Sequence, residues 1–453
     1  MKRYPAYKDS GVEWIGEIPE HWDSWRIKSI VKNCVNGLWG DDLKGDDGDV
    51  VCVRVADFQY NSLCVSNNNF TIRNIPIDQQ NGKILAPSDL LVEKSGGGEK
   101  QPVGRVVKYG RPEKAVCSNF IAKITTDNKK VDSVFSLYYF SDIYAKRVNT
   151  RSIKQTTGIQ NLDFYAYSTE KMPIPSKEEQ QSIANFLDHK TRLIDILIEK
   201  KQKQIELLQE QRTGIINHAV TKGLNHNVKM KETGIEWLGE VPEHWKTAKL
   251  GYYISILSGY AFPSTDFTQN ASDNRLLRGI NVGVSEIRWD DTVYWKREKD
   301  DCYDRFELKA GTLVAGMDRP WIKKGVRVAI ISEIDLPCLL LQRVVAINTS
   351  KDLVKEYLYR ILSSQLFIDY FTPSTTGVSV PHISPEQICN FKIPLPPFNE
   401  QQYIVTFLNR ETTKLENLID ININIIEQLQ EYRTTLISEV VTGKIDVREE
   451  VIP

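Results

Sequence analysis

The 453-residue sequence lacks the features of membrane proteins and of disulfide-rich secreted proteins. It has no run of about 18 apolar residues, which excludes a helix long enough to span a membrane. The first residues, Met1 to Lys8, include no apolar segment, so we expect no signal peptide. The seven cysteines contain no Cys-x-x-Cys pair, which argues against a disulfide framework and against a zinc site. We therefore expect a reduced, cytoplasmic protein.

Common catalytic motifs are also missing. There is no G-x-x-x-x-G-K-S/T loop for nucleotide phosphates and no H-E-x-x-H or G-x-S-x-G motif. No Asn-Pro-Pro-Tyr-type tetrapeptide and no F-x-G-x-G loop occur, so a methyltransferase site is not visible. The aspartates between Asp41 and Asp49 are crowded in a Gly-rich stretch, which favours a solvated turn over a nuclease metal site. These absences favour a binding protein without catalytic residues or metal ligands of its own.

The clearest positive feature is an internal repeat. The segment KDSGVEWIGEIPEHW, from Lys8 to Trp22, returns as KETGIEWLGEVPEHW from Lys231 to Trp245, at an offset of 223 residues. The residues Pro-Ile-Pro and Glu-Gln-Gln within 173–181 return as Pro-Leu-Pro and Glu-Gln-Gln within 394–402. Because the matches keep their order and nearly one offset, the chain consists of two copies of one module of about 220 residues.

Between the repeated segments lie two stretches that align poorly with each other, residues 23–175 and 246–395. Both contain strand-like apolar runs separated by Gly-rich turns, for example 50–55 and 326–331. Each insert is therefore predicted to be a mixed α/β globule that contains a sheet. The histidines of the repeated Pro-Glu-His-Trp, His21 and His244, are interpreted as hydrogen-bonded structural residues at a packing corner.

A long helical pattern follows each insert. Its apolar residues recur at the 4,3 spacing of a coiled-coil seam, and adding 221 to the first set gives the second. The helix-pairing candidates are Leu187, Ile194, Ile198, Ile205 and Leu208, with Leu408, Leu415, Ile419, Ile426 and Leu429. Ser176 and Asn399 are the expected N-caps. Such long seams cannot be buried against a small domain, so we expect two antiparallel helices that pack on each other about a pseudo-two-fold axis. The tail after Val441 should then lie near the N-terminus.

Charge points weakly to nucleic acid. The first insert carries 21 basic and 17 acidic residues, and the second carries 19 and 17. Three basic clusters are candidates for DNA contact: a Gly-rich loop after 90–92, a stretch before the Thr-Thr-Gly at 156–158, and a loop after 313–314. The candidate DNA-binding residues are Lys94, Gly96, Gly97, Gly98, Lys100, Arg105, Arg151, Lys154, Gln155, Arg319, Trp321, Lys323 and Lys324.

The repeated frame resembles the specificity subunit of Type I restriction-modification systems. The resemblance rests on YKDSGVEWIGEIPEHW, on its copy before the second insert, and on the P-I-P-x-x-x-E-Q-Q segment that leads into a long helix. It implies an α+β fold with two α/β target recognition domains separated by two long antiparallel coiled-coil helices. In that layout 1–22 is an N-terminal conserved segment, 23–175 the first recognition domain, 176–222 the central helix, 223–245 the repeated segment, 246–395 the second recognition domain, 396–445 the C-terminal helix and 446–453 the tail.

The resemblance also implies a function. Each recognition domain would read one half of a bipartite DNA target, while the helices set the spacer and dock two modification subunits. Those methyltransferase subunits would bring S-adenosylmethionine, and two restriction subunits would bring ATP- and Mg-dependent translocation and cleavage. The chain itself would be non-catalytic and would need no cofactor. The alternatives are a specificity subunit of a related non-cleaving anti-phage complex, a protein scaffold that does not bind DNA, and a solitary enzyme whose site carries no recognisable motif.

Overall fold

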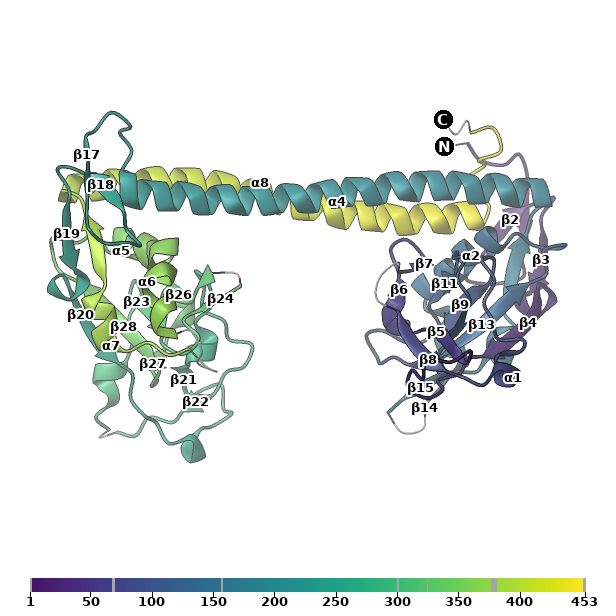
Figure 1. The fold of residues 1–453 in the computed structure, drawn as a ribbon, viewed down its shortest axis with the longest axis horizontal. Coiled ribbons are helices and arrows are strands. Elements are labelled where there is room, and N and C mark those ends of the chain that lie inside the picture. Colours follow the sequence, from purple (N-terminus) through teal and green to yellow (C-terminus); the bar gives the residue numbers. More distant parts are fainter. Residues whose placement is uncertain are drawn as a thin grey trace. The chain divides into compact units, whose positions relative to one another are not determined.

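The computed structural model describes residues 2–66, 70–155, 158–299, 301–323, 325–375 and 381–450. The chain forms two compact units (Figure 1). Unit 1 comprises residues 1–203 and 422–453, and unit 2 comprises residues 204–421. Two long helices, α4 (Lys177–Lys222) and α8 (Phe398–Val441), contribute one part to each unit. None of the helices in the described ranges is both long and apolar enough to cross a membrane.

The repeated segment of unit 1 forms a small frame. Strands β1 (Tyr7–Asp9) and β2 (Glu17–Pro19) make an antiparallel hairpin that leads to the fully buried Trp22. Strand β3 (Asp23–Arg26) then pairs antiparallel with β16 (Lys171–Ile174), so the first and last residues of the insert lie side by side. An insert whose two ends meet in one ladder can change its sequence and length without moving the frame.

The insert of unit 1 is built on a mixed sheet of six strands. Their order is β4 (Val31–Asn36), β13 (Ile121–Thr126), β9 (Leu90–Glu93), β11 (Val106–Lys108), β7 (Cys64–Val65) and β6 (Phe58–Gln59). Two smaller sheets complete it, with the orders β12 (Ala115–Cys117), β5 (Asp49–Val53), β8 (Thr71–Asn74) and β10 (Ser95–Gly96), β15 (Gln160–Leu162), β14 (Ile153–Gln155). Two one-turn helices, α1 (Ile77–Gln80) and α3 (Phe164–Tyr167), lie in the connections.

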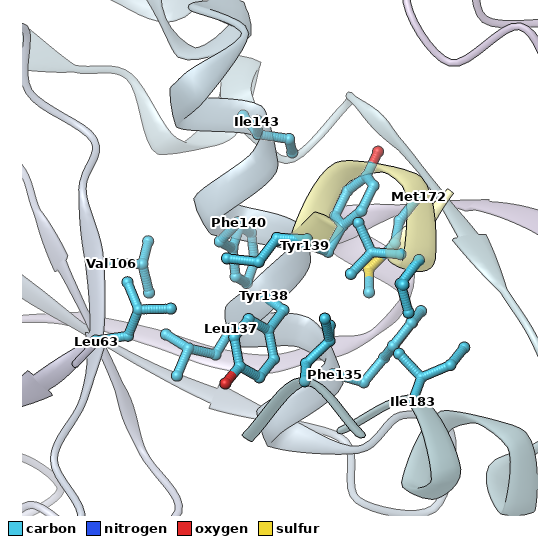
Figure 2. Close-up of a cluster of buried hydrophobic side chains, with 14 of the residues drawn as sticks. Leu63, Val106, Phe135, Leu137, Tyr138, Tyr139, Phe140, Ile143, Met172 and Ile183 are labelled. Atoms are coloured by element: carbon cyan, nitrogen blue, oxygen red, sulfur yellow. The ribbon is translucent and has the colours of Figure 1, made fainter. Parts of the chain in front are cut away.

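The largest core of unit 1 surrounds α2 (Ser133–Ala145). Asp132 caps this helix, because its carboxylate accepts from the backbone N–H groups of Val134 and Phe135. Figure 2 shows the buried side chains of α2 between Leu63 and Val106 on one side and Met172 and Ile183 on the other. The same core includes residues of both long helices, among them Phe186, Leu187, Ile194, Leu436, Ile437 and Val440. Within unit 1, the N-terminal part of α4 and the C-terminal part of α8 are therefore packed on each other.

The C-terminal tail closes unit 1, as the repeat predicted. The backbone N–H of Asp446 donates to the carbonyl oxygen of Lys2 at 2.9 Å, and Lys2 Nζ lies 2.8 Å from a carboxylate oxygen of Glu449. Gly443 starts this segment with φ +72, and a Cβ atom there would lie 2.3 Å from Cδ of Pro19. Only glycine allows the helix to end and the tail to lie against the frame at this point.

Unit 2 repeats this architecture. The hairpin β17 (Met230–Glu232) and β18 (Glu240–Pro242) leads to the buried Trp245, and β19 (Lys246–Lys249) pairs with β29 (Lys392–Leu395). The main sheet has the order β20 (Ile254–Ser258), β28 (Val344–Thr349), β23 (Leu313–Gly316), β26 (Val328–Ile330). Smaller sheets join β22 (Tyr294–Trp295), β21 (Asn274–Leu277) and β27 (Cys338–Leu340), and β24 (Trp321–Ile322) with β25 (Gly325–Val326).

The strand orders show that the poorly aligned inserts share one fold. The order β4-β13-β9-β11 matches β20-β28-β23-β26, and β12-β5-β8 matches β27-β21-β22, with the parallel pair at the same place. A glycine follows β4 and β20 in the same way: a Cβ atom would lie 2.1 Å from the carbonyl oxygen of Cys117 at Gly37 and of Leu341 at Gly259. A side chain cannot fit at either glycine, because the backbone at the end of β12 or just after β27 passes too close.

The helices of unit 2 are α5 (Lys355–Leu362), α6 (Gln365–Thr375), α7 (Pro385–Asn390) and the remaining parts of α4 and α8. Their core joins Ile216 and Val220 of α4 to Ile404 and Leu408 of α8. The expected cap at Asn399 was wrong, because α8 already begins at Phe398 and the carbonyl of Pro397 accepts from the backbone N–H groups of Glu400 and Gln401. In α4, Ser176 does act as expected, since its Oγ accepts from the Glu179 N–H at 3.2 Å.

The repeated histidines join frame to helix in both units. His21 Nε2 lies 3.0 Å from Oε2 of Glu179, and His244 Nε2 lies 2.8 Å from Oε2 of Glu400. The same glutamate in unit 2 accepts from Trp245 Nε1 at 3.0 Å. Their interpretation as hydrogen-bonded structural residues is confirmed.

Candidate nucleic-acid interface

The helix-pairing candidates all lie on the inward stripe of α4 and α8. Leu187, Ile194, Ile198, Leu408, Leu415 and Ile419 are buried, and Ile205, Leu208, Ile426 and Leu429 are half-buried. Two cross-helix ion pairs occupy equivalent places on this stripe. Arg433 Nε lies 3.1 Å from Asp195 Oδ1 in unit 1, and Arg212 Nη1 lies 3.3 Å from Glu416 Oε1 in unit 2. The offset of 221 relates Arg212 to Arg433 and Asp195 to Glu416, so the repeat extends to individual contacts between the helices.

The Gly-rich loop of unit 1, residues 94–105, is held in one conformation by its neighbours. Tyr144 OH donates to the carbonyl of Pro102 at 3.1 Å, Arg147 Nη2 to that of Lys100 at 3.1 Å, and Asn149 Nδ2 to that of Val103 at 2.7 Å. Tyr144 lies in the last turn of α2, and Arg147 and Asn149 belong to the candidate stretch before the Thr-Thr-Gly at 156–158. The loop also closes on itself, since the N–H of Gly98 donates to the carbonyl of Gln101 at 2.9 Å. Gly98 therefore uses its N–H inside the loop.

The basic candidates of unit 1 lie on and around this loop. Lys94 Nζ donates to Asn36 Oδ1 at 3.0 Å, and Lys100 is exposed. Arg105 is half-buried between two rings, with its Cζ 4.0 Å from the ring centroid of Tyr60 and 5.1 Å from that of Tyr144. Lys154, on β14, pairs with Asp163 at 2.6 Å. Arg151 and Gln155 are exposed, and Thr156 and Thr157 of the repeated Thr-Thr-Gly lie outside the described residues.

A cavity of about 460 Å³ opens beside this loop. Gly96 and Gly97 line it together with four residues that the sequence analysis missed, Trp39, Arg54, Glu93 and Phe120. A neighbouring hollow shares Glu93 and Gly97 with it and extends to Lys100 and Arg105. Trp39 and Phe120 are 40% and 44% exposed, whereas Glu93 is only 8% exposed. Burial raises the pKa of the Glu93 carboxyl to about 7, an effect that the nearby Arg105 partly offsets.

The corresponding loop of unit 2, residues 315–325, has as many basic residues as the loop of unit 1. Arg319 is exposed with φ 45, and its N–H donates to the carbonyl of Pro381 at 2.7 Å. Trp321 is half-buried against the core of unit 2. Lys323 is exposed and lines a groove of about 480 Å³ that also includes Arg212 and Arg360. Lys324 lies outside the described residues.

Strand register identifies the positions that correspond at the loops. Ile121 faces Glu93 on β13 and β9, and Val344 faces Gly316 on β28 and β23, so Phe120 corresponds to Arg343. Likewise, Ser95 pairs with Asn161 where Asp318 pairs with His382. We call these sets the variable corner of each unit: Glu93, Ser95, Phe120 and Asn161 in unit 1, and Gly316, Asp318, Arg343 and His382 in unit 2.

The two variable corners carry different side chains at each of the four positions. The corner of unit 1 holds the buried carboxylate of Glu93, the exposed ring of Phe120 and a hydrogen bond of 2.6 Å that Ser95 Oγ donates to Asn161 Oδ1. The corner of unit 2 holds a chain of polar contacts, in which His382 Nδ1 lies 2.6 Å from Asp318 Oδ1 and Arg343 Nη1 lies 3.2 Å from His382 Nε2. The same backbone therefore presents a carboxylate without a cationic side chain in the corner of unit 1, and a carboxylate together with the guanidinium of Arg343 in the corner of unit 2. The described part of the chain gathers no set of three or more His, Cys, Asp or Glu residues able to hold a metal ion.

Comparison with known proteins adds to this geometry. A family model described as Type I restriction modification DNA specificity domain matches the chain twice, over residues 19–207 and 242–431. The Type I restriction enzyme MjaVIII specificity subunit of Methanocaldococcus jannaschii is 28% identical over 435 residues, which cover 95% of this chain and 94% of that protein. The EcoAI specificity subunit of Escherichia coli is 37% identical over 168 residues, which cover 37% of this chain and 28% of that protein.

Two solved structures share the fold. A chain from a study of complex assembly and conformational transition of the type I R-M system aligns with a TM-score of 0.64 at 15% identity, covering 94% of this chain and 99% of the other. The HsdS subunit from Thermoanaerobacter tengcongensis aligns with a TM-score of 0.50 at 16% identity, covering 94% and 98%. At these identities the likeness concerns the fold alone.

Proposed function

The chain belongs to the family of Type I restriction modification DNA specificity domains, and we propose that it selects a bipartite DNA target for a modification and restriction complex. Its relatives are specificity subunits, which are non-catalytic, so the chain is not itself an enzyme. In this proposal the first recognition domain, residues 23–175, reads one half of the target and the second, residues 246–395, reads the other.

One observation carries the proposal: two inserts with the same strand order present different side chains at the same corner. A scaffold selected only for stability would not need different chemistry at equivalent positions beside these loops. Two readers of different half-sites would need it, because each base pair presents its own pattern of donors and acceptors in the major groove. The loops that carry Lys94, Lys100, Arg319 and Lys323 border these corners or the adjoining groove and would supply phosphate contacts.

The spacer between the half-sites would be set by α4 and α8. We propose that they form an antiparallel coiled-coil pair through both units, with Lys201 and Asn422 near a pseudo-two-fold axis. This is supported by the shared cores in each unit and by the equivalent ion pairs Asp195–Arg433 and Arg212–Glu416. A continuous helix has a fixed rise per residue, so it holds two readers at a fixed separation.

The outward faces of the helices would dock the partner subunits. Large apolar side chains are exposed there, including Leu197 at 47% and the equivalent Leu418 at 45%. We propose two modification subunits on these faces, which would bring S-adenosylmethionine, and two restriction subunits in the full cytoplasmic complex, which would bring ATP and Mg chemistry. The segments 1–22 and 223–245, together with the tail at 446–453, would join helices to recognition domains in both halves.

A methylation map tests the proposal. The chain would be produced with its modification partner in a host free of DNA methylation, and modified adenines would be mapped by single-molecule sequencing. We expect two short specific halves around a fixed unspecified gap, with one adenine modified on each strand. Replacing residues 246–395 by another recognition domain should change one half only, because β19 and β29 hold both ends of the insert in one ladder.

The matched exchange of residues 23–175 should change the other half only. A continuous palindrome, or a change of both halves after one exchange, would contradict the proposal. Absence of any motif, together with DNA affinity that does not depend on salt, would favour a scaffold that binds proteins instead.

A further inference from the structure

We propose that Glu93 is a specificity-determining residue of the first recognition domain, and that its carboxylate accepts a hydrogen bond from the N4 amino group of a cytosine in the half-site. The inference rests on the proposed function and names one chemical contact within it. The residue was not a candidate in the sequence, because it ends the apolar strand Leu90–Glu93 and reads as part of a core.

The position of Glu93 follows from the alternation of β9. Leu90 and Val92 point into the core around α2, whereas Leu91 points to the other face of the sheet, into the core that includes Val53 and Cys117. Glu93 lies on the same face of the sheet as Leu91, at the edge of this second core. The cavity beside the Gly-rich loop opens at this point, and a Cβ atom on Gly96 would lie 4.0 Å from Glu93 Oε1. The carboxylate therefore stands at the edge of the cavity, close to the glycines.

The carboxylate has no partner of its own. Glu93 is more than nine-tenths buried, yet none of the described residues donates a hydrogen bond to its side-chain carboxylate or forms an ion pair with it. Its raised pKa reflects the cost of an ionised group without donors in a buried place. The carboxylate oxygens keep access to the cavity, so a donor supplied by a ligand can reach them and take the place of water.

The cavity suits the edge of a cytosine–guanine pair. Carboxylates accept from the N4 amino group of cytosine, which is a donor in the major groove. Arg54 lines the cavity as well, with a side chain that is 41% exposed; its Nη2 lies 3.3 Å from Asp57 Oδ1, and the remaining N–H groups of the guanidinium would serve the acceptors of the paired guanine. The rings of Trp39 and Phe120 would exclude water, which strengthens a hydrogen bond to a buried carboxylate.

Unit 2 supplies an internal comparison. The position that corresponds to Glu93 is Gly316, which has no side chain, and Arg327 lies beside it. A second recognition domain without this carboxylate cannot make the same contact. The effect of changing Glu93 should therefore be confined to one position in one half of the target.

The experiment compares methylation maps of the complex formed with the unchanged chain and with Glu93→Gln. We expect one cytosine in the first half-site to lose its preference by roughly 5- to 150-fold, the range for one base contact, and adenine to be accepted there because glutamine pairs with adenine. The second half-site and the spacer should stay unchanged, which shows within the same map that the variant is folded. As a matched control, Glu13→Gln makes the same charge change at an exposed position between β1 and β2 and should leave the whole target unchanged.

The outcomes separate the two proposals. If the unchanged chain gives no split motif, the proposed function fails. If it gives a split motif and Glu93→Gln leaves the first half-site as it was, or alters the second, only the role of Glu93 is overturned. A Glu93→Ala variant distinguishes loss of an acceptor from a new glutamine contact, since it should relax the position without favouring adenine.

Discussion

Lengthening the long helices should lengthen the gap between the two halves of the DNA target. The change is an insertion of four helix-forming residues after Lys201 in α4, matched by the same insertion after Asn422 in α8. Both sites lie within a few residues of the boundary between the units, which falls after Lys203 and before Asn422. Four residues add about 6 Å of helix and turn it by about 1.1 turns, so the apolar stripe keeps nearly the same facing.

The expected result follows from comparing this rise with that of DNA. Since successive base pairs are about 3.4 Å apart, 6 Å corresponds to one or two additional base pairs in the spacer. The two half-sites should not change, because the variable corners are far in sequence from the inserted residues. The measurement is a methylation map of the unchanged and lengthened chains, each with the same modification partner.

A one-residue insertion at the same place is the control. It turns the following helix by about 100°, which moves the stripe away from its partner helix, so we expect loss of activity instead of a shifted spacer. Full activity of the four-residue variant with an unchanged spacer would refute the reasoning that the helices act as a ruler.

Three further predictions concern the stability of the fold. Trp22→Ala should lower the free energy of unfolding by about 3–5 kcal/mol, because the ring is fully buried in the frame, and urea unfolding checks this. Gly443→Ala should release the tail and speed amide hydrogen exchange in 444–449, whereas Gly214→Ala in open space inside α4 should stabilise by about 0.5–1 kcal/mol. Because Glu93 has its pKa raised to about 7 in the folded chain, the unfolded chain ionises first and stability should fall as pH rises through that value. In Glu93→Gln, urea unfolding at pH 5 and pH 8 should show that this dependence has gone.

The frame could be predicted from the sequence because it occurs twice. The hairpin before Trp22, its copy before Trp245 and the seams of α4 and α8 are visible as matched residues at nearly constant offsets. Particular residue types are required at three kinds of position: the buried tryptophan, the histidine that contacts a glutamate, and the apolar seams of the two long helices. Such requirements leave a pattern that survives divergence of the two copies.

The common fold of the inserts could not be predicted in the same way. A strand in a core needs only apolar residues of suitable size, so β9 and β23 can share a register without sharing a motif. The one local signal was the pair Gly37 and Gly259, where a side chain would collide with the neighbouring backbone. These glycines can be recognised as a signal only when the neighbouring backbone, at Cys117 and at Leu341, has been located. The sequence does not show that backbone.

The residues expected to contact DNA stay a prediction. The loops with Gly96, Gly97 and Lys323 do border a cavity or groove. Trp39, Arg54, Glu93 and Phe120 were missed because they come from four separate connections and strands that only the fold brings together. Glu93 offered one clue, a carboxylate directly after three apolar residues of a buried strand.

The interleaving of the two halves has a consequence for the order of synthesis. Unit 2 is continuous in sequence, from residue 204 to 421, whereas unit 1 needs residues 422–453 from the end of the chain. A ribosome that has reached residue 421 has synthesised every residue of unit 2, but Ile183, Leu187 and Ile194 still lack the core residues Leu436, Ile437 and Val440. The unit that is translated first is thus completed last, and its apolar surface stays exposed until residues 436–440 have been synthesised. An mRNA truncated after the codon for residue 421 would yield a chain with all residues of unit 2 and an incomplete core in unit 1, which chaperones and proteases can recognise.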